Sequence, residues 1–297
     1  MDPAVVNLSA NETSLDEKRP FFVEGDDVFQ FRGMRLFYSR RIGRAPQGST
    51  PAGTLYRDVP SSTSILGAAK LTGRTTGGLS LGALAAVTGE ETGVAAIETP
   101  SSSYDRVEFV AQPRSWYGVL RGRQDLRQGA STVGGVLTAV GRELPEDGAF
   151  DFLPSSAFTG GIDFEHMWGG REWAVEGYLA GSLVRGDSAA LIAIQRSSTH
   201  YFQRPDGRFE VDSARTALVG LSWEAGIERR SGEHWTGGAL LSGTTGGFEV
   251  NDLGFSGSGE SLGINTNIQY REIEPGEWLR SWDVSLSTFQ GWRGALL

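Results

Sequence analysis

The sequence contains no cysteine, which excludes a disulfide framework and a thiolate metal site. It also contains no apolar run that approaches the ~18–20 residues of a membrane-spanning helix. Lysine is nearly absent, since Lys18 and Lys70 are the only two, and 36 acidic residues against 27 basic ones give a formal net charge of −9. A chain of this charge has no general attraction to phosphate backbones, so we expect no nucleic-acid partner.

The chain is instead rich in glycine, with 42 residues, and in short strand-like stretches bounded by turn residues. Glycine at this level without a short repeat favours an all-β protein with many turns. No internal repeat is detectable. About eleven segments are predicted as strands, at 33–43, 63–73, 79–88, 106–124, 131–142, 158–168, 171–184, 215–228, 233–243, 261–271 and 279–289.

The connections between these segments alternate strictly between short and long. An up-and-down antiparallel sheet places every second connection at the same end, so this order makes the two ends unequal. Short turns at one end and long loops at the other are typical of an outer-membrane β-barrel, whereas a soluble sandwich has no physical reason to sort its loops. Many segments are also close to the ~9–11 residues that a tilted membrane strand needs. The tight connections are 74–78, 125–130, 169–170, 229–232 and 272–278, and the long ones are 43–62, 89–105, 143–157, 185–214 and 244–260.

Apolar and polar residues alternate with a period of two in most of these segments, which predicts one apolar and one wet face. The alternation does not say which face points inward, because a soluble sandwich has the same pattern with its apolar side inside. The segments 106–124 and 131–142 alternate poorly and cannot be oriented. The clearest case is 158–168, where Phe158, Ile162, Phe164 and Trp168 alternate with Thr159, Gly161, Asp163 and Glu165 before a predicted two-residue turn at Gly169-Gly170.

Large aromatic residues lie near the ends of strands. Trp168 and Trp173 flank one tight turn, Trp235 follows another, and Tyr270 and Trp278 bracket a third. This placement suits an interfacial aromatic girdle, although cross-strand packing of aromatic pairs in ordinary hairpins gives the same pattern.

One segment departs from the strand pattern. Asp187-Ser188 followed by apolar residues at helical spacing predicts an N-cap and one short amphipathic helix within the longest connection.

Charged residues suggest two sites. We expect a lumen ion network in which Arg35 and Arg41, on a first strand, pair with the acids Asp163 and Glu176 of other strands. An anion-attracting constriction formed by the same arginines and their neighbours is the alternative. Glu17, Lys18 and Arg19 are expected to form a periplasmic anchor.

No motif indicates an enzyme. Gly78-Leu79-Ser80-Leu81-Gly82 fits the nucleophile-elbow pattern, but the serine lies in an alternating strand that no helix follows. Of the three histidines, His166 and His234 fall near tight turns, and His200 in the longest connection is expected to be exposed to solvent. We therefore predict no catalytic residue, no cofactor and no metal.

Several motifs in order resemble one known family. They include Glu17-Lys18-Arg19-Pro20-Phe21-Phe22-Val23-Glu24-Gly25, Leu36-Phe37-Tyr38-Ser39-Arg40-Arg41-Ile42-Gly43, Ala69-Lys70-Leu71-Thr72-Gly73-Arg74, Thr159-Gly160-Gly161-Ile162-Asp163-Phe164, Tyr201-Phe202-Gln203-Arg204-Pro205 and Phe248-Glu249-Val250-Asn251-Asp252-Leu253-Gly254-Phe255. The chain resembles the uncharacterised bacterial family that joins an N-terminal carbohydrate-binding module of the family-nine type to a C-terminal outer-membrane barrel.

The resemblance implies that this chain is part of the barrel region, without the module. Its start, Met1-Asp2-Pro3-Ala4, has no signal-peptide pattern, and about eleven strands is an odd number where bacterial barrels have an even one. We therefore expect a truncated reading frame, with an incomplete barrel that folds poorly alone because its edges are unpaired.

The resulting prediction is an antiparallel up-and-down transmembrane β-barrel in the bacterial outer membrane. Residues 1–32 would be a periplasmic lead-in or lumen segment, and residues 33–297 the partial barrel. We expect a non-enzymatic channel or surface scaffold, with outer-membrane lipid as its partner and, through the absent module, carbohydrate. The main alternative is a secreted soluble β-sandwich or barrel that binds glycan, and a barrel hydrolase is the least favoured.

Overall fold

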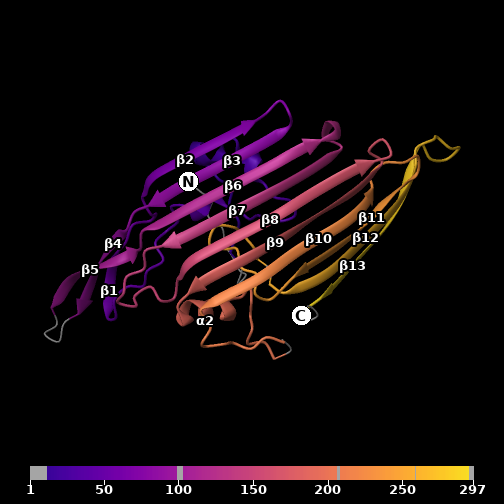
Figure 1. Ribbon diagram of the computed structural model, residues 1–297. Coiled ribbons are helices and arrows are strands. Elements are labelled where there is room, and N and C mark those ends of the chain that lie inside the picture. The colour runs from indigo at the N-terminus through magenta and orange to yellow at the C-terminus, as the bar shows by residue number, and fades with distance from the viewer. Residues whose placement is uncertain (1–11, 99–102, 206–207, 258, 294–297) are drawn as a thin grey trace.

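The computed structural model describes residues 12–98, 103–205, 208–257 and 259–293. Ten strands form one antiparallel sheet, in the order β13-β12-β11-β10-β9-β8-β7-β6-β3-β2 (Figure 1). Each strand pairs with the strand that follows it in sequence, except that β3 pairs with β6, so the sheet is up-and-down. Its members are β2 (Ile65–Arg74), β3 (Leu79–Thr88), β6 (Ser115–Leu126), β7 (Ser131–Arg142), β8 (Pro154–Trp168), β9 (Trp173–Gly186), β10 (Ala217–Arg229), β11 (Trp235–Thr244), β12 (Ser261–Glu272) and β13 (Trp282–Trp292).

A second, smaller sheet has the order β1-β4-β5, formed by β1 (Thr54–Asp58), β4 (Glu91–Glu98) and β5 (Tyr104–Gln112). Its strands β4 and β5 lie between β3 and β6 in the chain, whereas β1 precedes β2, and the sheet extends beyond the ends of β3 and β6 (Figure 1). The described helices are short: α1 (Pro20–Val23), α2 (Ser188–Arg196) and the 3-10 segments η1 (Asp26–Phe29), η2 (Ser39–Arg41) and η3 (Arg127–Gly129).

The predicted helix in the longest connection is confirmed. α2 begins after Asp187, whose side chain accepts a hydrogen bond of 3.1 Å from the Ala189 N–H. An aspartate in this position satisfies one of the free N–H groups of the first turn.

The two ends of the large sheet differ as the loop alternation predicts. At one end β2–β3, β6–β7, β8–β9, β10–β11 and β12–β13 are joined by short connections. At the other end the connections are long, and they contain β4 and β5 of the small sheet, residues 143–153, residues 187–216 with α2, and residues 245–260. The tight turn after β8 is longer than predicted: Trp168 pairs with Trp173, so residues 169–172 form it, with Gly169, Gly170 and Arg171 all at positive φ.

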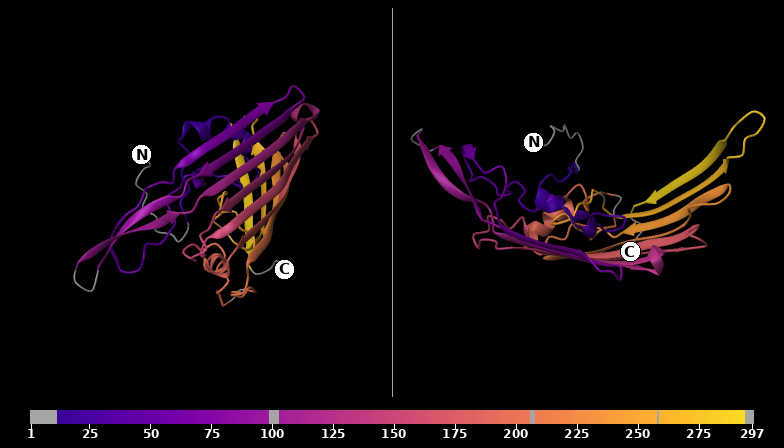
Figure 2. Two further views of the ribbon diagram at one scale, coloured as in Figure 1. Left: turned by 60° about the vertical axis from the view of Figure 1, so that its left-hand side comes forward. Right: turned by 90° about the horizontal axis from the view of Figure 1, so that it is seen from above.

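The large sheet is curved and open. In the described chain, β2 pairs only with β3 and β13 only with β12, so the sheet does not close on itself. Residues 20–42 and 245–257 lie together in the hollow of its concave face, as the view from above shows (Figure 2). We call these two segments the inner layer. Arg35 and Phe255 join them through an antiparallel bridge.

The hydrophobic core lies between the inner layer and the concave face. Aromatic residues of the inner layer fill space above glycines of the sheet: a Cβ at Gly82 would lie 2.9 Å from the Phe29 ring, and one at Gly161 would lie 2.7 Å from the Phe31 ring. Such close approach requires glycine. The buried apolar residues of the two main clusters are Phe22, Phe29, Ile42, Leu84, Ala86, Tyr117, Val119, Val140, Ala157, Val184 and Leu253, and Phe31, Leu36, Val136, Tyr178, Ala180, Phe248 and Val250.

Two predicted strands and two predicted loops are wrong. Residues 33–43 form no strand of the sheet but part of the inner layer, where Gly33 and Gly43 adopt positive φ. The segment 106–124 is two strands, β5 and β6, interrupted at Pro113, which has no N–H to donate to a ladder. β1 and β4 fall in stretches that were expected to be loops. The large sheet thus has ten strands, an even number, where about eleven were expected.

Candidate functional site

The concave face carries a network of ion pairs. Arg121 of β6 donates two hydrogen bonds to Asp163 of β8, at 2.6 and 2.9 Å, in a bidentate arrangement. The Phe31 ring of the inner layer covers the same guanidinium at 5.5 Å. Gly134 makes this pairing possible, because a Cβ there would lie 2.6 Å from both an Arg121 nitrogen and an Asp163 oxygen.

A second group of ion pairs lies nearer the short-turn end. Arg32 of the inner layer reaches Glu165 at 3.0 Å and Glu176 at 2.7 Å. Arg230, in the turn after β10, reaches the same two carboxylates at 2.6 and 2.9 Å. Two arginines and two glutamates from β8, β9, a turn and the inner layer therefore form one network. It ties the inner layer to the sheet by charge in addition to apolar packing.

The predicted network residues do not pair with one another. Asp163 and Glu176 do lie on the concave face, but their partners are Arg121, and Arg32 with Arg230. Arg35 instead donates to Ser14 Oγ at 2.7 Å and lies over the Tyr38 ring. Arg41 donates to the Gly254 carbonyl oxygen at 3.1 Å and to Glu12 at 2.8 Å. Arg35 and Arg41 do not make the predicted ion pairs because their segment belongs to the inner layer and is not a strand of the sheet.

The predicted anchor residues hold the start of the inner layer. Arg19 pairs with Glu17 at 2.6 Å and donates to the backbone carbonyl oxygens of Ile42 at 2.7 Å and Ser39 at 2.9 Å. Burial alone would raise the pKa of Glu17, but hydrogen bonds from Arg19 and Ser39 outweigh it and lower the pKa to about 2. Lys70 of β2 adds hydrogen bonds to the carbonyl oxygens of Phe21 and Glu24. Lys18 donates its backbone N–H to Glu17 at 2.9 Å.

His200 is buried, which corrects the expectation that it is exposed: its relative accessibility is 5%. Its Nδ1 lies 2.8 Å from the Gly246 carbonyl oxygen, and its Nε2 lies 2.7 Å from Glu249. Both ring nitrogens are therefore engaged, and the residue fastens the α2 connection to the inner layer. No local sequence signal links it to an acid 49 positions away.

The nucleophile-elbow pattern forms no hydrolase site. Ser80 lies within β3, where it pairs with Arg74 and Arg123 of the neighbouring strands, and the strand continues past it to Thr88. Within the described residues no group of three or more His, Asp or Glu side chains is placed to hold a metal ion.

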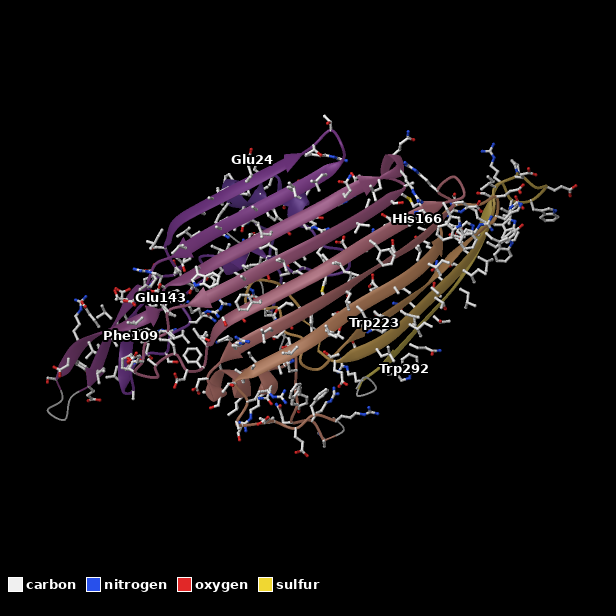
Figure 3. The ribbon with its side chains drawn as sticks, viewed as in Figure 1. Glu24, Phe109, Glu143, His166, Trp223 and Trp292 are labelled. Atoms are coloured by element: carbon white, nitrogen blue, oxygen red, sulfur yellow. The ribbon has the colours of Figure 1, made fainter. Side chains whose placement is uncertain are left out.

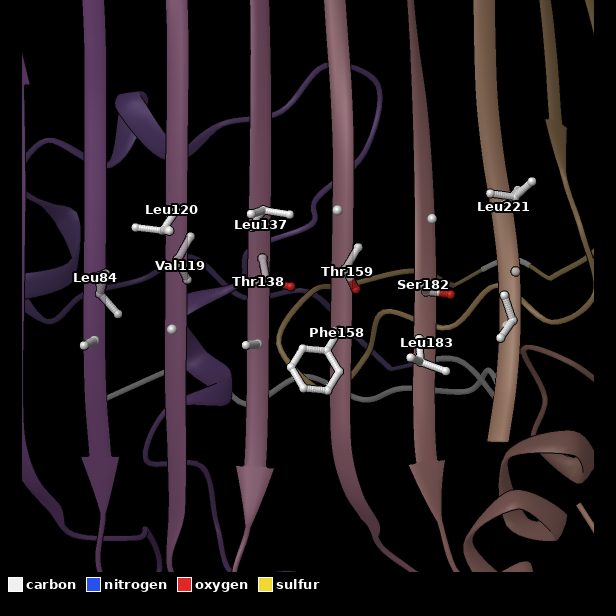
Figure 4. Close-up of a pocket in the computed structure, with 17 residues that line it drawn as sticks. Leu84, Val119, Leu120, Leu137, Thr138, Phe158, Thr159, Ser182, Leu183 and Leu221 are labelled. Atoms are coloured by element: carbon white, nitrogen blue, oxygen red, sulfur yellow. The ribbon is translucent and has the colours of Figure 1, made fainter. Parts of the chain in front are cut away.

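The convex face of the sheet has the opposite character. Apolar side chains project from consecutive strands into solvent, including Leu137, Ile162 and Val219, which are 60%, 62% and 67% exposed. Glycines between them leave shallow apolar hollows of about 690 and 1080 Å³. Figure 4 shows the first hollow, with Leu120, Leu137, Phe158 and Leu221 at its rim and the inner layer behind the sheet.

Aromatic rings gather at the short-turn end of the sheet. Trp168 and Trp173 stack across the β8–β9 hairpin with their centroids 6.2 Å apart. Tyr270 contacts Trp235 at 4.9 Å and Trp282 at 5.1 Å, so a second cluster spans three strands. Figure 3 shows His166 beside this crowded end, and Trp292 toward the other end of the sheet.

In the comparison with known protein families, residues 1–293 match the family described as a domain of unknown function (DUF5916). The chain belongs to this family. No curated protein and no solved structure matches the sequence. The DUF5916 match supports the expected membership of an uncharacterised family, whereas a carbohydrate-binding module and a barrel family are not among the matches. In the described part of the chain no helix is long and apolar enough to cross a membrane.

Proposed function

We propose that this chain forms part of the wall of an outer-membrane β-barrel, with its convex face against lipid and its concave face around the inner layer. The observation that carries the proposal is the continuous apolar convex face. Soluble monomers rarely expose contiguous apolar patches larger than a few hundred Å², and here exposed Leu, Ile, Val and Phe side chains occur on strand after strand. The ion pairs described above lie on the other face.

Two further features support the proposal. The strands of the large sheet have 10 to 15 residues, enough for the ~9–11 residues of a tilted membrane strand. The aromatic rings at the short-turn end have the amphipathic character that favours a membrane–water interface.

The inner layer favours a surface scaffold or a plugged barrel over an open channel. Phe29, Phe31 and Phe248 are buried against the concave face, and the ion pairs of Arg32 fasten the same layer. A polar solute would therefore meet packed side chains over this part of the sheet. The proposal includes no enzymatic activity.

Among the described residues, the sheet has two unpaired edge strands, β2 and β13, which a membrane location must accommodate. Hydrocarbon does not tolerate unpaired strand edges, because water is absent and each free N–H or carbonyl group costs several kcal/mol. Strands outside the described sheet must therefore pair with β2 and β13 in the membrane.

The competing function, a soluble glycan-binding sandwich, requires a second layer over the apolar convex face. The small β1-β4-β5 sheet extends beyond the end of the large sheet and does not cover this face (Figure 2). The association with carbohydrate stays a prediction that rests on the resemblance alone.

Fractionation of cells that produce the natural full-length protein tests the proposal. We expect the protein in the outer-membrane fraction, resistant to carbonate washing and released by detergent, with heat-modifiable migration on a gel. Recovery in the soluble periplasmic or secreted fraction without detergent would contradict it.

A further inference from the structure

A cleft of about 460 Å³, lined by both polar and apolar residues, opens at the long-loop end of the molecule, away from the apolar face. This volume lies within the ~300–1,000 Å³ that ligand pockets occupy. Its walls come from five segments that are distant in sequence: Glu12, residues 44–47, residues 152–154, the end of α2 with residues 197–199, and residues 249–257. We call it the Arg44 cleft.

The acidic residues of the Arg44 cleft are already neutralised. Glu249 faces His200, and the Gly246 carbonyl oxygen requires a hydrogen on the other ring nitrogen of that histidine. The pair is therefore neutral as a whole, whether His200 or Glu249 holds the second proton. Three carboxyl groups line the cleft, and each has a partner: Glu12 pairs with Arg41 at 2.7 Å, Asp252 with Arg142 at 2.5 Å, and Glu249 with His200 at 2.7 Å.

Arg44 is the exception. Its guanidinium donates to the side-chain oxygen of Gln47, a neutral amide, and it forms no ion pair with a carboxylate among the residues that the structure describes. Burial lowers its pKa to about 10, and the charges of Arg142 and Arg41 contribute in the same direction while Asp252 opposes them. Arg44 is still protonated near neutral pH, so the cleft holds one positive charge that no acid balances.

Hydrogen bonds hold the backbone of Arg44 and Gln47 in place. The Arg44 carbonyl oxygen accepts hydrogen bonds from the Thr63 N–H at 3.0 Å and the Thr63 hydroxyl at 2.7 Å. The Gln47 N–H in turn donates to the Gln112 side chain at 2.9 Å. The fixed backbone and the hydrogen bond from the guanidinium to Gln47 partly preorganise the charge for a ligand, which reduces the ordering cost of binding.

The remaining walls indicate what else the ligand carries. Ser197, Thr199 and Asn251 supply hydroxyl and amide groups, and Phe152 and Ile194 supply an apolar wall. We propose that the Arg44 cleft binds a small hydroxylated oxyanion, whose carboxylate or phosphate group pairs with Arg44 while its hydroxyl groups face the polar side chains. A planar guanidinium binds either anionic group through two parallel hydrogen bonds. This inference does not depend on the proposed membrane location.

Calorimetric titration of the purified full-length protein in detergent tests the inference with three sugars of equal ring size: glucuronate, glucose 6-phosphate and glucose. We expect at least one of the two anions to bind at least tenfold more tightly than glucose, and the tighter of them identifies the preferred anionic group. Equal binding of all three, or no binding of either anion at millimolar concentration, would overturn the proposal.

Two variants locate the site. Arg44→Gln keeps a hydrogen-bonding side chain but removes the charge, so we expect anion affinity to fall at least tenfold, to the level of glucose. Arg57→Gln, at an exposed arginine of β1, is the matched control and should bind as the wild type does. If Arg44→Gln fails to fold, Ala193→Phe decides, since Ala193 is an exposed cleft residue of α2 and a ring there fills the cleft. Unchanged anion binding in a folded Arg44→Gln or Ala193→Phe variant would contradict the assignment.

Discussion

Strands β7 and β12 belong to the same sheet but meet different surroundings on its concave face. In β7, Val136 and Val140 point into the core beneath the inner layer and are almost fully buried, while Val133 and Leu137 on the convex face are exposed. In β12 the concave positions are polar, as at Asn265 and Asn267, and no described buried cluster includes them. One strand is thus apolar on both faces, and the other on one face only.

This difference explains why 261–271 alternates clearly in the sequence and 131–142 does not. Where the concave face is open, solvent selects polar residues at every second position, and the period of two is plain. Where apolar side chains cover it, as over Val136 and Val140, burial selects apolar residues there as well, and the period disappears. Poor alternation at 131–142 is therefore a consequence of the inner layer. In β8 the period persists under the inner layer because the concave positions include Thr159 and the paired Asp163.

The largest expected effect is the introduction of a charge under the inner layer. Val136→Asp places an unpaired carboxylate in the core, and we expect it to lower the free energy of unfolding by about 4 kcal/mol or to abolish folding. Asn267→Asp on β12 is the matched control and should change it by less than about 0.5 kcal/mol. Denaturant titration of both variants measures the change in the free energy of unfolding. Equal changes would contradict the claim that the inner layer buries the concave face at β7 but not at β12.

A somewhat smaller effect should follow from breaking the buried ion pair. Arg121→Met leaves Asp163 without its partner, so we expect a loss of about 3 kcal/mol. Adding Asp163→Asn removes the stranded charge and should recover part of that loss. Additive losses in this double-mutant cycle would show that the two side chains do not interact.

Adjacent glycines of β7 offer a finer comparison of the two faces. In Gly134→Ala the new Cβ collides with Arg121 and Asp163 at 2.6 Å, whereas in Gly135→Ala its nearest neighbour is a carbonyl oxygen at 3.7 Å. We expect the first to cost about 2 kcal/mol and the second less than about 0.5 kcal/mol. Thermal unfolding of both variants measures the two losses of stability. A larger loss in Gly135→Ala than in Gly134→Ala would contradict the position of the Arg121–Asp163 pair on the Gly134 side of β7.

The smallest effect concerns the anchor of the inner layer and depends on pH. The folded-state pKa of Glu17 is lowered from 4.5 to about 2, so its contribution is complete above pH 4.5 and is lost as the pH falls toward 2. At pH 7 we expect Glu17→Gln to lower the free energy of unfolding by about 1 kcal/mol, because partial exposure screens the interaction. The difference between wild type and variant should vanish near pH 2; a difference that does not change with pH would rule out ionisation as its source.

The sequence predicted those parts of the fold that depend on local pattern. The bounds of β3 and β7 agree with the predicted segments, and α2 follows from its N-cap Asp187. The segment 33–43 was mistaken for a strand because burial under the sheet also selects apolar residues such as Leu36 and Ile42. Pro113 was the available signal that 106–124 is two strands.

For the ion pairs, the sequence predicts only the face of the sheet on which the acidic residues lie, and not their partners. Alternation places Asp163 and Glu176 on the wet side of their strands, which the structure bears out as the concave face. Their partners lie up to 144 positions away in sequence, and no local pattern selects Arg121 or Arg32 over other arginines. The Arg44 cleft likewise forms only when five distant segments meet.

The central claim is that the convex face contacts lipid, and cysteine accessibility in isolated outer membranes tests it most directly. The chain has no cysteine of its own, so Leu137→Cys on the convex face and Asn267→Cys on the concave face each add one thiol to it. We predict that a water-soluble maleimide labels Asn267→Cys in intact membranes but labels Leu137→Cys only after denaturation. Rapid labelling of Leu137→Cys in native protein, at a rate equal to that of Asn267→Cys, would contradict the membrane assignment.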